Sequence, residues 1–359
     1  MHQEDFFNIL HAWYQCILIE DKEGAEAYRT EAEPRIQLTN SKPLKTYFNL
    51  VQFRHKVMTR EVLNEPVQPK TFIEDAIRES DTAIQYLGYY VKGFSDFSNE
   101  RYSQALESFI QAERLLSNIN PLEQADFYLR TSACYYRLSQ YPLALAYAKE
   151  AQRIFKPSKK HYRQTVNTMV LISGIKQDTF TFDLPNKYFD DCLMHAADDS
   201  YTESIVFRAK GLYFMKQEKL HISKRAFENA LKLQINHRGT LSIKTECDLA
   251  YVCFKLDFHT EGIHYLNNAR HQAEQAGLIE QISRCMFMEG FFHPNGLNQE
   301  QVDQSLEMLS SHGLHYDLGE LVREVRLHYV NDEDFHTAHK YSSMLLETIS
   351  DQQKEGILT

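Results

Sequence analysis

The sequence is poor in the residues that interrupt regular secondary structure. Its 359 residues include only nine prolines and thirteen glycines. Folds built from many short strands need these residues at their turns, so their scarcity disfavours a turn-rich β architecture. No run approaches the roughly 18 consecutive apolar residues of a membrane-spanning helix. The first ten residues also lack the basic start and apolar run of a secretory leader. These absences predict a cytoplasmic protein.

Signatures of metal and cofactor chemistry are missing as well. The six cysteines form no CxxC pair, which favours isolated thiols in a reducing compartment. Two histidine pairs, His312 with His315 and His336 with His339, have the spacing of ligands on one helix face. Neither has a neighbouring Cys or a Glu-x-x-His arrangement to complete a site. Glycine-rich nucleotide motifs are absent too, so we expect no metal and no cofactor.

The charge balance shows no basic excess. The 49 acidic residues outnumber the 39 lysines and arginines, and the formal net charge is −10. Proteins that bind duplexes gain much of their affinity from basic surfaces that neutralise phosphates. We therefore expect neither nucleic acid nor an anionic membrane as a direct partner.

The sequence does contain a repeated helix-pair pattern of the tetratricopeptide type. One anchor position recurs about every 39 residues, at Ala105, Ala144, Leu184, Ser223, Gly262, Val302 and Ala338. Twelve residues earlier, where the first helix of a pair must be small to let the backbones approach, stand Gly93, Ser132, Ile172, Gly211, Ala250, Gly290 and Arg326. Five of these seven fit, and the third and seventh repeats are the degenerate ones.

The region before residue 65 does not share this phase. Its apolar spacing predicts three helices, roughly over 5–20, over 22–38 and after Pro43. The segment 64–71 contains two prolines and no periodicity, which is typical of a linker or hinge. We predict an all-α protein: a three-helix bundle over 1–63, this linker, and a right-handed superhelix of six or seven tetratricopeptide repeats over 72–350.

Three local segments resemble the Rap family of Bacillus-type regulators. Trp13-Tyr14 is similar to the first-helix EWY segment of that family. The stretch 47–55, YFNLVQFRH, is similar to its third-helix YYxLxxFRH segment, and 89–93, YYVKG, to the start of its first repeat. The resemblance extends over nearly the whole chain.

The resemblance implies a mechanism. Rap proteins grip a response regulator with the N-terminal bundle and the neighbouring repeats. Some dephosphorylate an aspartyl-phosphate in the sporulation phosphorelay, and others only sequester a DNA-binding competence regulator. A short secreted and re-imported peptide, a quorum-sensing signal, binds inside the repeats and releases the target. For this chain the resemblance implies the same two partners, a response regulator or transcription factor and a signalling peptide.

Two positions depart from the family pattern. The Gln that orients the attacking water in phosphatase members maps to Lys42, which has no amide acceptor to hold a water. No catalytic residue is therefore assigned, and phosphatase activity is uncertain. The Asn that often clamps the peptide backbone in the fourth repeat maps to Ala209. The peptide is thus expected to differ from those of the family, to bind more weakly or to be absent.

Two sets of candidate binding residues follow. The third helix carries Lys42, Lys45, Asn49, Gln52 and Lys56, a docking surface for an acidic target. Positions on the first helix of each pair that line the concave face are Arg130, Tyr136, Arg208, Lys244, Asp248, Tyr251 and Arg284. Asp178 joins this peptide-binding set because the family carries an acidic residue there. The alternative interpretation is a solvated groove wall with internal ion pairs.

Other functions remain open from the sequence. The leading hypothesis is a regulator that acts by binding, and the main alternative is an aspartyl-phosphate phosphatase. A repeat scaffold without a peptide switch is a third. A DNA-binding relative is disfavoured because residues 1–65 have neither a Gly-containing turn between two short helices nor a basic recognition helix.

Overall fold

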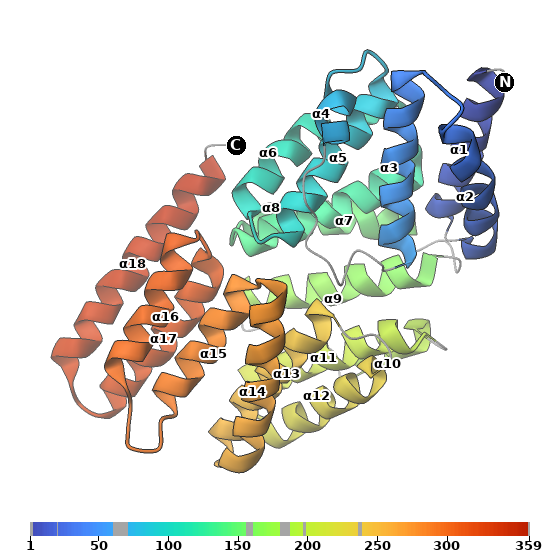
Figure 1. Ribbon diagram of the computed structural model, residues 1–359. Helices are drawn as coiled ribbons and strands as arrows, with labels where there is room; N and C mark the ends of the chain where they lie inside the picture. The colour runs from blue at the N-terminus through green and yellow to red at the C-terminus, as the bar shows by residue number, and fades with distance from the viewer. Residues whose placement is uncertain are drawn as a thin grey trace. The chain divides into compact units, whose positions relative to one another are not determined.

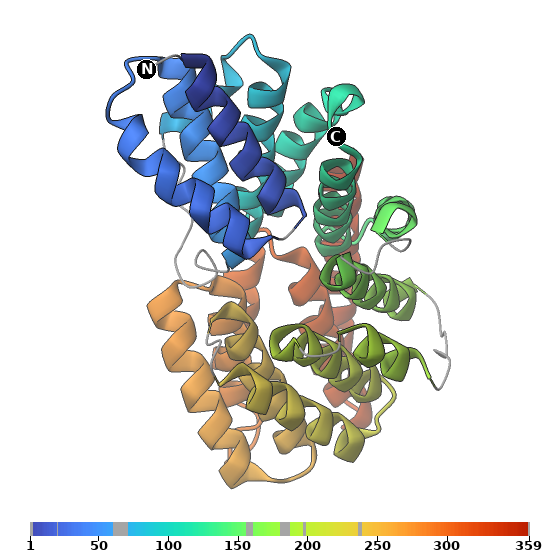
Figure 2. The same ribbon diagram turned by 90° about the vertical axis from the view of Figure 1, so that its right-hand side faces the viewer.

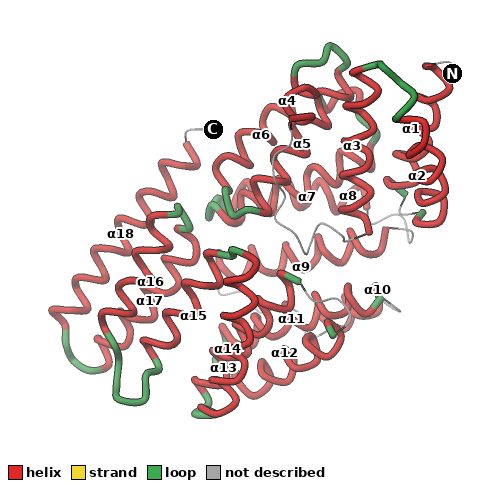
Figure 3. Tube along the Cα trace, viewed as in Figure 1, coloured by secondary structure: helices red, strands yellow, loops and turns green. Residues whose placement is uncertain are grey.

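The computed structural model describes residues 3–19, 21–59, 71–155, 161–179, 187–196, 199–235 and 239–357. Within these ranges the chain contains helices, turns and loops and no strand (Figure 3). The prediction of an all-α fold is confirmed. Most of the predicted linker, 64–71, falls outside the described ranges.

The helices follow one another through short connections. The first four are α1 (Gln3–Leu18), α2 (Lys22–Ile36), α3 (Lys42–Thr59) and the short α4 (Thr71–Ile77). The next seven elements are α5 (Thr82–Ser98), α6 (Tyr102–Glu113), the 3-10 turn η2 (Leu116–Asn118), α7 (Pro121–Arg137), α8 (Tyr141–Phe155), α9 (Tyr162–Thr179) and α10 (Tyr188–Ala196). The last eight are α11 (Ser200–Lys216), α12 (Leu220–Gln234), α13 (Thr240–Lys255), α14 (His259–Ala276), α15 (Ile279–Phe291), α16 (Gln299–Ser311), α17 (His315–Asn331) and α18 (Phe335–Ile357).

The chain divides into two compact units. Unit 1 comprises Met1–Cys134 and Leu143–Thr168, and unit 2 comprises Tyr135–Pro142 and Met169–Thr359. In unit 1, α3 packs against α1, α2, α4 and α5, as Figure 1 shows. In unit 2 the helices from α11 to α18 pack in chain order, each against the next (Figure 2). The last helix continues past residue 350, where we expected the array to end, to Ile357.

The predicted small residues lie at tight helix crossings. A β-carbon added at Gly93 would lie 2.7 Å from the Phe109 ring, and one added at Gly211 would lie 2.5 Å from the Phe227 ring. At Gly290 the nearest atom, the Asn298 carbonyl oxygen, would be 3.1 Å away. The backbones therefore approach as closely as the repeat pattern predicted.

Hydroxyl side chains reinforce these crossings. Ser223 Oγ donates a 2.8 Å hydrogen bond to the Gly211 carbonyl, and Ser132 Oγ donates one of 2.7 Å to the Ala144 carbonyl. Both serines are buried, so each bond satisfies a group that would otherwise be costly to bury. The degenerate seventh repeat reverses the sizes, because Arg326 Nε donates 3.1 Å across the crossing to the small Ser342.

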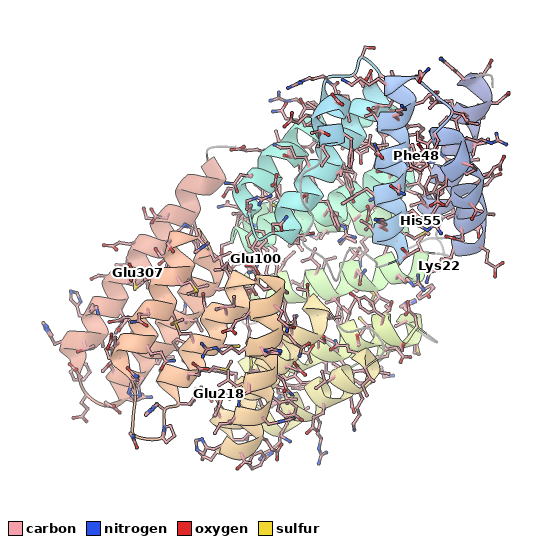
Figure 4. All side chains as sticks on the ribbon, in the orientation of Figure 1. Lys22, Phe48, His55, Glu100, Glu218 and Glu307 are labelled. Atoms are coloured by element: carbon pink, nitrogen blue, oxygen red, sulfur yellow. The ribbon has the colours of Figure 1, made fainter. Side chains whose placement is uncertain are left out.

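The turn between the two helices of a pair has a conserved backbone form within the chain. A residue with positive φ stands seven positions after the crossing residue at Glu100, Ser139, Glu218, Asp257 and Glu333, with φ between 58° and 62°. The amide that follows donates back to the helix, for example Lys219 N to the Phe214 carbonyl at 2.9 Å. This is the left-handed helix end that usually takes glycine, and Figure 4 labels two of its members, Glu100 and Glu218.

Candidate functional site

The five residues predicted to contact a target form one stripe along α3. Lys42, Lys45, Asn49, Gln52 and Lys56 are spaced three or four residues apart, which places them on one face of the helix. The three lysines are exposed and the two amides are half-buried. This α3 stripe is a basic, hydrogen-bonding surface whose charge suits an acidic partner.

The position expected to carry a catalytic glutamine is a surface cation. Lys42 is the first residue of α3, and its side chain is 67% exposed. Its ammonium group pairs with Asp75 of α4 at 2.7 Å. An ammonium donates hydrogen bonds and cannot accept one from an attacking water, so the Lys42 side chain can attract a phosphate but has no acceptor to orient a water.

The opposite face of α3 is buried, and the Phe53-Arg54-His55 segment gives each residue a different partner. The Phe53 ring meets Phe94 of α5 edge-on, with centroids 5.7 Å apart. His55 Nδ1 accepts a 3.0 Å hydrogen bond from the indole nitrogen of Trp13 in α1. Figure 4 shows His55 on α3 together with the buried Phe48. This segment therefore fixes α3 to the bundle on one side and to the first repeat on the other.

Arg54 joins α3 to α7 through a buried charge cluster. Its Nη1 donates to Tyr90 at 2.9 Å and to Asp126 at 3.0 Å, and its Nη2 lies 3.6 Å from Glu123. Tyr14 of α1 donates to the same Glu123 carboxylate. Burial alone would raise the pKa of Asp126, but Arg54 and Arg130, with the hydrogen bond from Tyr90, together lower that pKa. Burial prevails at Glu123, whose pKa is raised despite Arg54.

Seven of the eight predicted peptide-binding residues lie in unit 2, and the structure pairs most of them internally. Arg208 Nη2 contacts Asp248 at 2.6 Å, and Lys244 Nζ contacts Glu280 at 3.1 Å. Tyr136 donates a 2.6 Å hydrogen bond to Asp178.

The remaining predicted residues are less uniform. Arg284 contacts Asp317 at 2.9 Å, while the Tyr251 ring packs edge-on against Phe292 with centroids 5.8 Å apart. Arg130 belongs to unit 1, where its guanidinium lies 5.0 Å from the Phe94 ring centre.

These pairs join into a continuous network along unit 2. The order of contacts is Tyr136, Asp178, Lys216, Glu320, Arg284, Asp317, Arg137, Glu280 and Lys244. With the Arg208–Asp248 pair added, five cations face five carboxylates, so the groove charges neutralise one another. We call these residues the groove network.

Sequence reasoning missed Arg137, Lys216, Glu280, Tyr316, Asp317 and Glu320. The predicted residues lie mostly in the middle of the first helix of a pair, whereas most of the missed residues stand in the first or last turn of such a helix. One signal was available: Arg137 and Lys216 each lie five residues after a predicted crossing residue, Ser132 and Gly211. Their partners Glu280, Asp317 and Glu320 come from repeats far along the chain, which spacing within one repeat cannot reveal.

Burial and neighbouring cations compete for the carboxylates of the groove network. Burial alone would raise the pKa of Glu280, but Arg137, Lys244 and Arg284 together lower it well below its usual range. The pKa of Glu320 is lowered in the same way, with Arg284 and Lys216 outweighing burial. Asp317 is fully enclosed, and burial raises its pKa although two arginines contact it.

Comparison with known proteins shows similarity to one family of regulators. The family described as "response regulator aspartate phosphatase H, N terminal" matches residues 1–60, the region of the α3 stripe. "Response regulator aspartate phosphatase I" of Bacillus subtilis (strain 168) is 22% identical, over 94% of this chain and 89% of its own length. The chain is thus similar to Rap proteins, both in this N-terminal segment and over nearly its whole length.

Similarity to this family extends through the repeats. "Regulatory protein RapG" of Bacillus subtilis (strain 168) is 21% identical and covers 95% of this chain and 96% of its own length. A Rap protein complexed with competence and sporulation factor superposes with a TM-score of 0.88 at 19% identity, over 99% of this chain and 100% of its own. This confirms the tetratricopeptide-like repeat fold.

One similar protein has a name of another kind. A "Type II methyltransferase M.CeqI" of Rhodococcus hoagii is 27% identical, over 96% of this chain and 68% of its own length. At this level of identity the name describes that protein and not the present chain.

Membrane-spanning helices and metal-binding clusters are both absent from the described residues. No helix among them is long and apolar enough to cross a membrane. Nowhere in the same residues do three or more His, Cys, Asp or Glu side chains gather in a way that could hold a metal ion.

Proposed function

We propose that this chain is a member of the Rap family and a peptide-gated regulator of the cytoplasm. Its N-terminal bundle binds a response regulator or a DNA-binding transcription factor, and a short signalling peptide in the repeat groove releases that target. The observation that carries the proposal is the α3 stripe, an exposed basic face on the helix within the segment that matches the family. The side chains of a phosphorylated aspartate and its acidic surroundings would complement that face.

Solved relatives support the peptide half of the proposal. A Rap conjugation gene regulator was solved with the Phr* peptide, with a TM-score of 0.69 and 20% identity, over 99% of this chain and 96% of its own. In the present chain, the groove network provides hydrogen-bond donors and acceptors from α9, α11, α13, α15 and α17. A peptide that exchanges with these internal pairs would contact several repeats at once.

Binding is favoured over hydrolysis because of Lys42. Its exposed ammonium, paired with Asp75, can attract a phosphoryl group but cannot accept a proton from water or orient it. The proposal is therefore sequestration of the target. Phosphatase activity is the second candidate. It would need an amide side chain elsewhere on the bundle to orient the attacking water.

A phosphate-release assay separates these two functions. Purified chain is mixed with phosphorylated receiver domains from the same organism, and phosphate release is followed beside binding by calorimetry. The expected result is a receiver that binds without faster phosphate loss. A Lys42→Gln variant that gains hydrolysis would identify the wild type as a binder, whereas rapid phosphate release by wild type would establish the phosphatase instead.

The peptide step also has a structural cost that can be tested. Any movement of the bundle away from the first repeat must break the contacts of Arg54 with Tyr90 and Asp126. Scattering of the full chain with and without candidate pentapeptides should show a change in compaction when the target is released. No change with any peptide that binds would favour a scaffold without a switch.

Methyl transfer is not supported by the geometry. In open α/β proteins, nucleotide-like ligands bind where parallel strands end. The described parts of this chain contain no strand on which such a site could be built.

A further inference from the structure

One arginine of unit 2 connects helices that are remote from it in sequence. Arg137, in the last turn of α7, places Nη2 2.7 Å from Glu280 Oε2 and 2.5 Å from Asp317 Oδ2. These carboxylates stand in the first turns of α15 and α17, 143 and 180 residues further along the chain. The guanidinium also lies 5.0 Å from the Tyr316 ring centre.

Such a contact is unusual for a repeat array. Repeats of a solenoid contact their neighbours in the chain, and the array is otherwise held by those neighbouring interfaces. The packing of α11 through α18 follows this rule, with each helix against the next. The Arg137 contacts depart from this rule of neighbouring contacts, because they join the segment Tyr135–Pro142 directly to the last repeats.

Two residues near Arg137 make contacts of the same kind. The Tyr136 hydroxyl bonds Asp178 of α9 at 2.6 Å and lies 3.2 Å from the Tyr316 hydroxyl of α17. Gln140 donates a 3.1 Å hydrogen bond to the Gln352 carbonyl in α18. The short segment 136–140 therefore touches α17 and α18, two helices of the last repeat, in addition to α9 of the next repeat.

The carboxylates that hold Arg137 are deeply buried. The side chain of Glu280 is 5% exposed and that of Asp317 is not exposed at all. Two other cations reach this pair, Lys244 and Arg284, but Arg284 also contacts Glu320. Without Arg137, Glu280 would keep Lys244 and Asp317 would keep only Arg284, which also contacts Glu320. Removing one partner of a buried ion pair is strongly destabilising.

We propose that Arg137 is a latch that closes unit 2 by joining the segment Tyr135–Pro142 to the first turns of α15 and α17. The latch belongs to the chain itself and does not depend on the proposed peptide or target. Its Nη2 bridges the two carboxylates. Separation of the segment Tyr135–Pro142 from α15 and α17 requires this bridge to break.

The test compares full-length Arg137→Met with wild type by small-angle scattering and thermal unfolding, with no peptide present. We expect a larger radius of gyration and a Tm lower by about 5 °C or more. Arg153→Met is the matched control, because Arg153 is 69% exposed and pairs only with Glu150 in its own helix among the described contacts. The control should change neither quantity.

Two further variants separate a latch from a merely structural charge. The double variant Arg137→Met/Glu280→Gln removes one carboxylate with the cation, so its Tm should recover in part while the chain stays expanded. Arg137→Lys keeps the charge but loses the guanidinium plane that lies over the Tyr316 ring. The radius of gyration should therefore increase as in Arg137→Met, while Tm should fall less than in Arg137→Met. A radius of gyration equal to wild type in all three variants would overturn the proposal, and so would an Arg137→Met variant that matches Arg153→Met.

Discussion

Arg54 of α3 donates a 3.0 Å hydrogen bond to Asp126 of α7, 72 residues further along the chain. Only 7% of the Arg54 side chain is exposed, so this contact lies inside unit 1 and not on its surface. The residues on either side, Phe53 and His55, face the first repeat and α1 respectively. The segment that carries the family resemblance is thus a structural junction, while the basic stripe of the same helix remains exposed.

Removal of the Arg54 cation should strongly destabilise unit 1. In Arg54→Met, the buried Glu123 and Asp126 carboxylates lose their main counter-charge. We expect a loss of about 3–5 kcal/mol in the free energy of unfolding, as for other broken buried pairs. Urea denaturation measures it. Arg153→Met, which removes an exposed charge, should cost no more than about 1 kcal/mol, and equal effects would contradict the burial argument.

Two glycine substitutions should change the stability of the protein in opposite directions. Alanine normally favours a helix over glycine by about 1 kcal/mol. At Gly319 the nearest atom to an added β-carbon is 3.9 Å away, so Gly319→Ala should stabilise the protein by up to that amount. At Gly211 the added carbon meets Phe227 at 2.5 Å, so Gly211→Ala should destabilise it by about 1–3 kcal/mol. Thermal unfolding of both variants checks the crossing geometry, and two changes of the same sign would refute it.

The left-handed turn residues predict a stabilising glycine. Glu218 has φ of 58°, a conformation that costs a residue with a β-carbon about 1–2 kcal/mol. Glu218→Gly should raise the free energy of unfolding by about 0.5–1 kcal/mol, because the relief exceeds the added flexibility of the unfolded chain. Glu228→Gly, in the interior of α12, provides the control and should cost about 1 kcal/mol. Chemical denaturation distinguishes gain from loss.

The groove network should make stability depend on pH through Glu280. Its pKa in the folded chain is lowered by Arg137, Lys244 and Arg284, against an unfolded value of about 4.3. A carboxylate with a lowered folded pKa stabilises the fold above its unfolded pKa, and this contribution is lost as pH falls through the folded value. Glu280→Gln should therefore be most destabilising near pH 7, and its deficit should shrink below about pH 4. Denaturation from pH 3 to 7 tests this, and a deficit that grows on acidification would show the sign to be wrong.

Charge reversal on the α3 stripe should weaken target binding. Lys45→Glu/Lys56→Glu changes two exposed cations without touching the buried face of α3. We expect affinity for the receiver domain that binds wild type to fall about tenfold, mainly through slower association at low salt. Lys149→Glu/Lys232→Glu changes the net charge equally at exposed sites on α8 and α12. Calorimetry at two salt concentrations compares the pairs, and similar losses would exclude a local docking surface.

The sequence alone determined the repeat architecture. Local rules were sufficient, because a helix crossing requires a small residue wherever two backbones meet, and Gly93, Gly211 and Gly290 stand at such crossings. Helical periodicity also placed the five residues of the α3 stripe on one face. These features depend on neighbours within about one repeat, so spacing along the chain encodes them.

Only the tertiary structure decided the partners of the charged groove residues. Arg137 meets Asp317 across 180 residues, and Tyr136 meets both Asp178 and Tyr316. No periodic pattern specifies such contacts. They arise because the small rotations between successive repeats add up along the array. Arg208, Lys244 and Arg284 have carboxylate partners in the next repeat, which are the internal ion pairs of the alternative interpretation, and only the tertiary structure shows which carboxylate each one meets.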